Sequence, residues 1–138
     1  MPETVARTVL AFDFGIRRVG VAVGEPETCT AHPLRGIALA GEARFAAVGR
    51  LIAQWRPARL LVGLPLGVEG APHEVTRRAE RFARQLRGRF GLPVELVDER
   101  FTSVEAESRL RGKRNARIAT DSVAAQLILE QYLGERAA

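Results

Sequence analysis

Four acidic residues stand at points of the 138-residue chain where carboxylates of distant segments could act together. Asp13 lies near the end of the apolar run 9–14, and Asp98 and Glu99 follow the apolar run 94–97. Asp121 precedes apolar residues at helical spacing on one face: Ala125, Ile128 and Tyr132. A carboxylate at the end of a buried strand costs several kcal/mol, roughly, unless another group compensates its charge. Asp13 is therefore predicted to be functional, although an Asp that caps a hairpin turn is a common alternative.

Only one of Asp98 and Glu99 can point toward Asp13, because adjacent strand residues face opposite sides of a sheet. Periodicity does not choose between them, and an ordinary polar strand end paired with Arg100 is an alternative explanation. Asp121 also has a structural alternative, since an acid near a helix start is favoured by the helix dipole.

Three carboxylates at one edge of a sheet would repel one another, and divalent cations relieve this repulsion. Oxygen ligands favour Mg²⁺ or Mn²⁺ over zinc. Two such ions held together can activate water and stabilise the leaving oxygen of a phosphodiester. The acidic positions therefore predict a metal-dependent nuclease.

The elements that must position these acids follow from the hydrophobic pattern. Strands are expected at 9–14, 19–23, 34–39, 60–64 and 94–97, and helices at 41–55, 72–89, 103–110 and 121–133. The short connection 15–18 predicts an antiparallel hairpin, and the helices 41–55 and 72–89 provide crossovers between later strands. This order predicts an α/β fold: a mixed five-stranded sheet with an antiparallel meander, then βαβ crossovers, flanked by helices. A dinucleotide-binding fold would need a helix directly after the first strand.

Composition favours a folded domain with a polyanionic partner. The chain has 46% hydrophobic and 27% charged residues, which predicts one domain over residues 1–138. Lys and Arg number 21 against 16 acids, giving a net charge of +5, and Lys113 is the one lysine. This balance predicts binding to nucleic acid, although a GC-rich genome would also favour Arg over Lys. One cysteine, no apolar run long enough to span a membrane and no signal-peptide pattern predict a cytoplasmic protein.

The segment 111–117 carries several cations without an intervening acid, just before Asp121: Arg111, Lys113, Arg114 and Arg117. A run of like charge is usually a solvated surface, but its position beside the proposed site favours contact with phosphates. The arginines of the helix 72–89 are expected to form a solvated face.

Four blocks of sequence resemble the YqgF family, also called RuvX, of pre-16S rRNA nucleases or Holliday junction resolvase-like proteins. They are the opening A-F-D-F-G-I-R-R-V-G-V-A-V at 11–23, V-G-L-P-L at 62–66, D-E-R-F-T-S-V-E-A at 98–106 and D-S-V-A-A-Q-L-I-L at 121–129. Together they span most of the chain in the family's order, which makes the resemblance specific.

The resemblance implies a ribonuclease H-like fold and a catalytic set of Asp13, Glu99 and Asp121 as ligands of Mg²⁺ or Mn²⁺. Asp98 is the alternative to Glu99. It also implies that the cations and the hydroxyl of the matched blocks contact nucleic acid: Arg17, Arg18, Arg100 and Thr102. The expected function is 5′-end processing of precursor 16S rRNA. The alternative is resolution of four-way DNA junctions, whose two symmetric cuts imply a twofold dimer.

Two other classes of protein are also compatible with the sequence. A sugar-kinase-like or actin-like ATPase shares the opening hairpin but binds nucleotide between two related domains. A catalytically silent nucleic-acid-binding module could have the same fold, but the retention of all three acids argues against it.

Overall fold

The computed structural model describes residues 7–64, 74–98 and 116–137, and for 116–121, 136 and 137 only their place in a helix. The strands are β1 (Val9–Asp13), β2 (Val19–Glu25), β3 (Thr30–Ile37), β4 (Arg59–Leu64) and β5 (Val94–Asp98). The helices are α1 (Gly41–Trp55), α2 (Glu74–Phe90) and α4 (Ala116–Ala137). The expected helix 103–110 lies outside the described residues.

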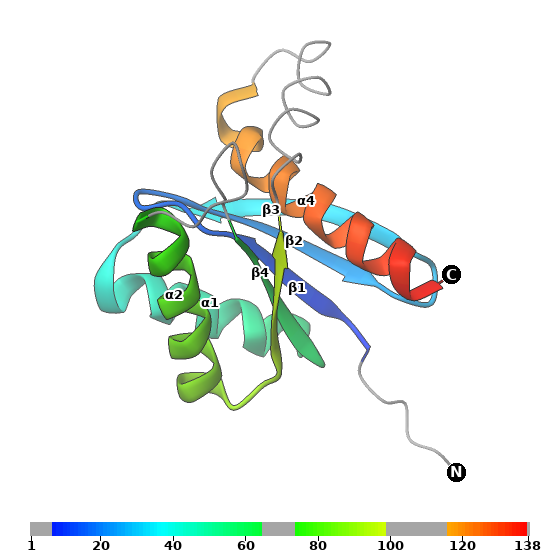
Figure 1. Cartoon of the computed structure of the whole chain (residues 1–138), viewed down its shortest axis with the longest axis horizontal. Helices are drawn as coiled ribbons and strands as arrows, with labels where there is room; N and C mark the ends of the chain where they lie inside the picture. The colour runs from blue at the N-terminus through cyan, green and yellow to red at the C-terminus, as the bar shows by residue number, and fades with distance from the viewer. Residues whose placement is uncertain (1–6, 65–73, 99–115, 138) are drawn as a thin grey trace.

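The strands form one mixed sheet in the order β3-β2-β1-β4-β5 (Figure 1). β1 pairs antiparallel with β2 and parallel with β4, while β5 pairs parallel with β4. The predicted meander followed by crossovers is therefore confirmed, and β1 is the central strand. Its burial on both faces explains why its sequence is continuously apolar.

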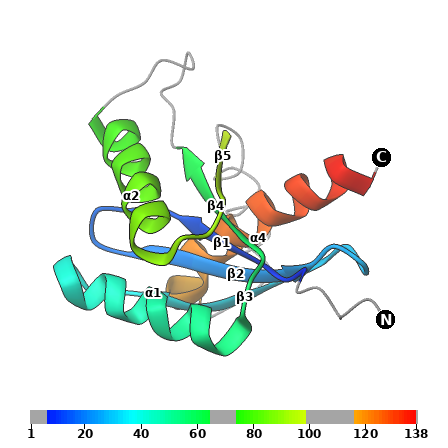
Figure 2. The same cartoon turned by 90° about the horizontal axis from the view of Figure 1, so that it is seen from below.

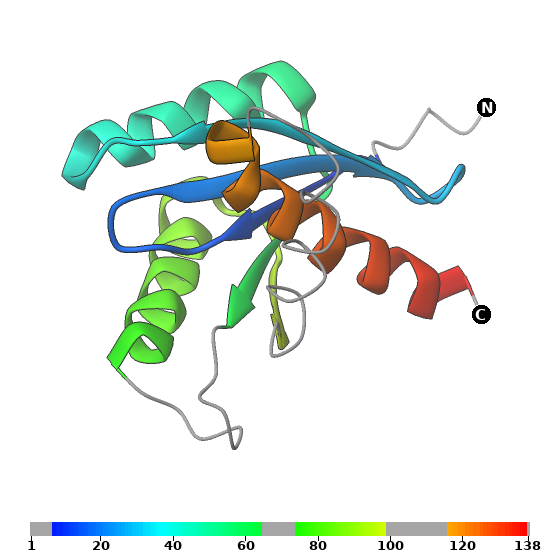
Figure 3. The ribbon, with the colours of Figure 1, turned by 90° about the horizontal axis from the view of Figure 1, so that it is seen from above.

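Helices cover both faces of the sheet. α1 and α2 lie on one face, in front of the strands in Figure 2, and α4 lies on the other, in front of them in Figure 3. Phe12 and Leu10 of β1 pack on the α1 and α2 side with Val48, Phe82 and other apolar residues. Val9 and Ala11 pack on the opposite side against α4. Because side chains alternate along β1, the strand contributes to two separate cores, one on each face of the sheet.

α4 comes very close to the sheet at Gly24 of β2. A Cβ placed on this glycine would lie 2.7 Å from the Leu129 side chain and 2.7 Å from the Thr30 carbonyl oxygen. A larger residue would push α4 away from β2, so the glycine sets how deeply the helix is seated.

The largest differences from the predicted boundaries are in β3 and α4. β3 begins at Thr30 and ends at Ile37, four residues earlier at its start than expected. It is an edge strand with mostly exposed side chains, and Pro33 within it is tolerated at an edge. Hydrophobic patterning is weak in such a strand, which explains the error. The final helix starts at Ala116, five residues before Asp121, so Asp121 does not open it and the prediction of an acid at its first turn was wrong.

Candidate active site

Asp13 ends the central strand between two glycines. It pairs with Gly20 of β2 and with Gly63 of β4, and these partners lie on the same face of the sheet as Asp13. Neither paired residue has a side chain, and the Asp13 carboxylate is half-buried. Glycines in strand interiors often mark a close approach by a ligand. The local sequence therefore places positions without side chains on both sides of one carboxylate.

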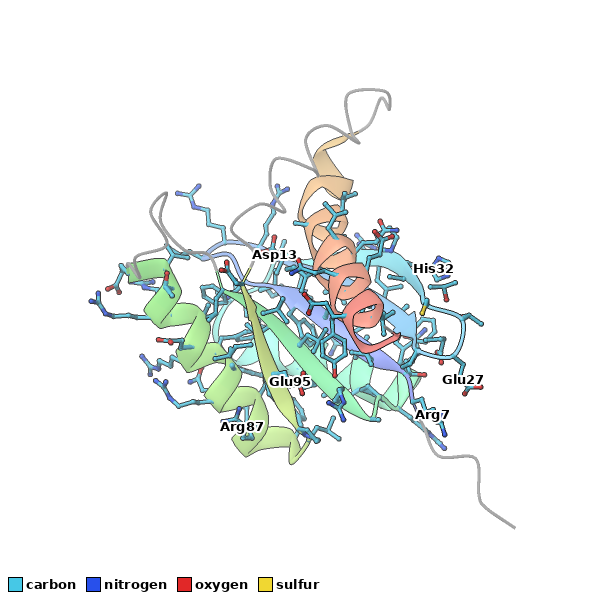
Figure 4. The ribbon with its side chains drawn as sticks, turned by 45° about the vertical axis from the view of Figure 1, so that its right-hand side comes forward. Arg7, Asp13, Glu27, His32, Arg87 and Glu95 are labelled. Carbon is cyan, nitrogen blue, oxygen red and sulfur yellow. The ribbon has the colours of Figure 1, made fainter. Side chains whose placement is uncertain are left out.

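The face on which Asp13 lies follows from alternation along β1. Val9 and Ala11 share the α4 side, and Asp13 follows them at the same period of two. Figure 4 shows Asp13 at the end of the sheet opposite to Arg7 and Glu27. The carboxylate thus belongs to the α4 side of this end.

Contacts at both ends of α4 fix its direction over the sheet. The Val21 amide of β2 donates to Ser122 Oγ at 3.2 Å, and Arg59 Nη1 donates to the Tyr132 hydroxyl at 2.9 Å. Val21 pairs with Phe12 near the end of β1, whereas Arg59 pairs with Val9 at its start. α4 therefore runs antiparallel to β1, and its N-terminal half lies over the end that carries Asp13.

Position 121 precedes Ser122 and shares, by helical spacing, one face of α4 with three residues that pack against the sheet. Ala125, Leu129 and Tyr132 stand four, eight and eleven residues further on, and all three pack against the sheet. The residues predicted to follow Asp121 on one face are confirmed as buried: Ala125, Ile128 and Tyr132. The backbone brings position 121 and Asp13 to the same end and the same face of the sheet.

We expect Ser122, which sequence reasoning did not single out, to be a positioning residue. The register between β2 and β3 shifts between Val19 and Val21, and the buried Val21 amide bonds to the Ser122 hydroxyl. A bulge in a sheet often occurs beside an active site. The hydrogen bond between Val21 and Ser122 becomes visible only once the strands are paired, because nothing in the helical pattern marks this serine.

We expect Ser122→Ala to lower the free energy of unfolding by about 1–3 kcal/mol, because the buried Val21 amide loses its acceptor. Chemical denaturation measures this change. Gln126→Ala is the matched control, since it removes a part-buried α4 contact, to the Ala31 carbonyl at 3.0 Å, further along the helix. Cleavage should fall in the Ser122 variant and stay near native in the Gln126 variant. Equal cleavage by both would contradict the positioning role.

Alternation along β5 places Asp98 on one face of the sheet. Val97 packs in the α4-side core, and Val94 packs in the core on the α1 and α2 side. Asp98, adjacent to Val97 and four residues after Val94, thus lies on the α1 and α2 side, opposite to Asp13. Glu99 lies outside the described residues.

The predicted nucleic-acid contacts are only partly described. Arg17 and Arg18 are exposed in the turn that follows Asp13. Arg117 falls in α4, which replaces the end of the expected basic loop, and its side chain is not described. The remaining predicted contacts lie outside the described residues: Arg100, Thr102, Arg111, Lys113 and Arg114.

A buried arginine, Arg44 of α1, holds the turn after Asp13. Its Nη2 donates to the Ile16 carbonyl at 2.9 Å and its Nε to the Leu39 carbonyl at 2.8 Å. The guanidinium carbon lies 5.7 Å from the Phe14 ring centroid. Burial lowers the pKa of the Arg44 guanidinium. Sequence reasoning missed it because nothing in a helical pattern marks one arginine among twenty.

Within the described ranges, no three His, Cys, Asp or Glu residues gather as a metal-binding group. Two of the predicted ligands, Glu99 and the Asp121 side chain, are not among the described groups. The helices of the described ranges include none with the length and apolar character needed to cross a bilayer.

The fold is ribonuclease H-like, as the similarity to solved structures shows. Thermus thermophilus RuvC, solved in complex with a Holliday junction substrate, matches with a TM-score of 0.62 at 19% identity, over 95% of this chain and 96% of that chain. Archaeoglobus fulgidus Pelota matches with a TM-score of 0.51 at 10% identity, over 96% of this chain and 35% of that chain. At these identities the matches show the fold alone.

The sequence comparisons identify the family. The profile described as "RuvX: Holliday junction resolvase" matches residues 7–135. A Dechloromonas aromatica protein named "Putative pre-16S rRNA nuclease" is 53% identical over 130 residues, covering 91% of this chain and 89% of its own. A Burkholderia mallei protein of the same name is 56% identical over 127 residues, covering 91% and 87%. The chain belongs to the RuvX family of nucleases.

Proposed function

We propose that the chain is a divalent-metal-dependent endonuclease in which Asp13, Glu99 and Asp121 are the metal ligands. The observation that carries this proposal is the glycine-flanked carboxylate of Asp13 at the end of the central strand, on the face covered by α4. Position 121 belongs to that face and that end. Alternation along β5 favours Glu99 over Asp98, since Asp98 lies on the opposite face.

The donor set fits Mg²⁺ or Mn²⁺. All three proposed ligands are carboxylates, and hard oxygen donors suit these ions. When bound, a pair of such ions supplies a nucleophile at neutral pH and stabilises charge on the attacking and leaving oxygens of a phosphodiester.

The chain's own residues have two further roles. The three carboxylates compensate the charge of the ions and fix their place at the end of β1. The exposed Arg17 and Arg18 stand in the turn directly after Asp13, where their guanidinium groups can bind phosphate and orient the strand for cleavage. The matched-block and basic-segment residues are proposed to do the same: Arg100, Thr102, Arg111, Lys113, Arg114 and Arg117.

We propose precursor 16S rRNA as the physiological substrate, cleaved on its 5′ side, which implies action in the cytoplasm. The support is the shared name of relatives that are 53% and 56% identical over about nine-tenths of this chain. The second candidate substrate is a four-way DNA junction, which the description of the family favours. Resolving a junction requires two symmetric cuts and therefore a twofold dimer, so a chain that acts as a monomer on its substrate would exclude junction resolution.

Cleavage is expected to require Mg²⁺ or Mn²⁺ and to stop in EDTA. Ca²⁺ should suppress it, because this larger ion accepts more ligands in a looser geometry than Mg²⁺. The measurement follows a labelled RNA on a gel with each ion in turn, and restoring excess Mg²⁺ after EDTA is the control. Cleavage at the full rate in EDTA would overturn the metal-dependent mechanism.

A further inference from the structure

A strongly basic groove lies on the face of the sheet opposite to Asp13's carboxylate. It has a volume of about 640 Å³ and is bounded by the start of α1, the end of β1 and α2. Five arginines line it: Arg44, Arg77, Arg78, Arg81 and Arg84. One acid, Glu74, also lines it and pairs with Arg78 at 3.1 Å. Five cations and one anion leave a local charge of +4.

Three of these arginines form a row along α2. Arg77, Arg81 and Arg84 are four and three residues apart, so they share one helix face over roughly 10 Å. All three are exposed, and none has an acid partner among the described residues. Like charges four residues apart destabilise a helix. The row therefore lowers the stability of α2 when no ligand is bound, and an anion in the groove would offset the repulsion between the arginines.

The remaining lining explains why the row keeps its place. Phe82 of α2 is buried, and its ring centroid lies 5.3 Å from that of Phe14 and 5.8 Å from that of Phe45. These rings anchor α2 to β1 and α1 beneath the arginines. Arg44 adds a buried cation whose two carbonyl contacts hold it in one orientation. A concave, rigid surface lined by one sign of charge concentrates the field on an anionic partner.

The groove begins next to the proposed active site. Phe14 lines it and directly follows Asp13, although the two residues lie on opposite faces of the sheet. A strand that passes the end of β1 on the α4 side could therefore continue around that end and along α2. One strand of a duplex advances about 3.4 Å per phosphate, so a row of roughly 10 Å spans about three phosphates. A single nucleotide would leave most of the row unused.

We propose that this groove binds the phosphate backbone of the substrate strand beyond the cleaved bond. The inference rests on the proposed nuclease function and adds a second contact region, on α2 rather than on α4. Arginine contacts to phosphate position a strand without reading its bases. Binding through the groove should therefore be strong at low salt and independent of sequence.

The test is a salt titration of binding by the variant Arg77→Gln, Arg81→Gln, Arg84→Gln. The probes are a labelled RNA stem with single-stranded extensions and the same stem without them, in EDTA. If each arginine contacts one phosphate, the slope of log affinity against log salt should fall by about two to three. The variant should also gain less from the extensions than the native chain does.

The matched control is Arg7→Gln, Arg35→Gln, Arg50→Gln. These arginines are also exposed and without an acid partner among the described residues, but they do not line the groove. Both variants lose three positive charges, so overall charge cannot explain a difference between them. Only the groove variant should show a shallower slope of log affinity against log salt. An equal loss in both variants, or an unchanged slope in the groove variant, would overturn the proposal.

Two further readouts separate the possible failures. Arg81→Gln alone should reduce the slope of log affinity against log salt by roughly one or slightly less. This single variant replaces the triple variant in the test if the triple variant unfolds more easily. Failure of the proposed nuclease function would instead appear as no cleavage by the native chain in Mg²⁺, with the difference in binding between the two triple variants intact.

Discussion

Asp13→Asn is expected to slow cleavage by roughly 10³-fold, because the loss of one preorganised charge at the reacting phosphate is worth about that much in enzymes of known mechanism. The substitution keeps the shape of the side chain and one oxygen while removing the charge. Since Asp13 ends its strand between Gly20 and Gly63, the packing around it should change little. The readout is the single-turnover cleavage rate on labelled RNA.

Binding and stability of the Asp13→Asn protein, measured separately, should remain close to native. Glu27→Gln is the matched control, since it removes one negative charge from an exposed turn at the other end of the sheet (Figure 4). That control should cleave at the native rate. An Asp13→Asn protein as active as the control would rule out Asp13 as a metal ligand.

The second large effect is expected from Glu99→Gln, which should reduce cleavage by about 10²- to 10³-fold. Asp98→Asn should leave cleavage close to native, because Asp98 lies on the α1 and α2 face of β5 and Asp13 lies on the α4 face. The two substitutions remove the same charge from neighbouring positions, so each controls for the other. Single-turnover rates under identical metal conditions provide the comparison.

The reverse order, with Asp98→Asn inactive and Glu99→Gln active, would show that β5 presents its other face to the substrate. It would separate the choice of ligand from the metal-dependent mechanism itself, since a carboxylate from this strand would still be needed.

The central strand was predictable because its sequence and its environment agree. The apolar run 9–14 requires burial on both faces, and β1 is indeed the middle strand of five. The turn at 15–18 is too short for a helix, so the hairpin was also predictable. A Cβ on Gly15 would lie 2.3 Å from the Arg18 carbonyl oxygen, which explains a glycine in this turn.

The edge strand and the start of the last helix were harder to predict because packing specifies them weakly. β3 exposes most of its side chains, so its sequence carries little alternation. Residues 116–120 precede the apolar stripe of α4, and a stripe marks only the part of a helix that packs. Sequence periodicity therefore locates buried segments better than the ends of elements.

The groove on α2 depends on contacts that sequence does not show. The row of arginines was predicted to be a solvated face, which is the usual fate of such a row. Its relation to Phe14 and Arg44 arises only when α1 and α2 pack on the same side of the sheet. The family resemblance already implied Glu99 as the ligand, and the packing of Val94 and Val97 adds that Asp98 lies on the face opposite to Asp13.

The most direct test of the central claim is cleavage of a 5′-labelled precursor 16S rRNA fragment by the purified chain, with a four-way DNA junction assayed in parallel. We expect a defined cut on the 5′ side of the rRNA in Mg²⁺, no cut in EDTA, and cleavage slowed by roughly 10³-fold in the Asp13→Asn protein. Cutting confined to the junction would replace the substrate but keep the chemistry. Cleavage that persists both in EDTA and with Asp13→Asn would contradict a metal-dependent nuclease built on Asp13.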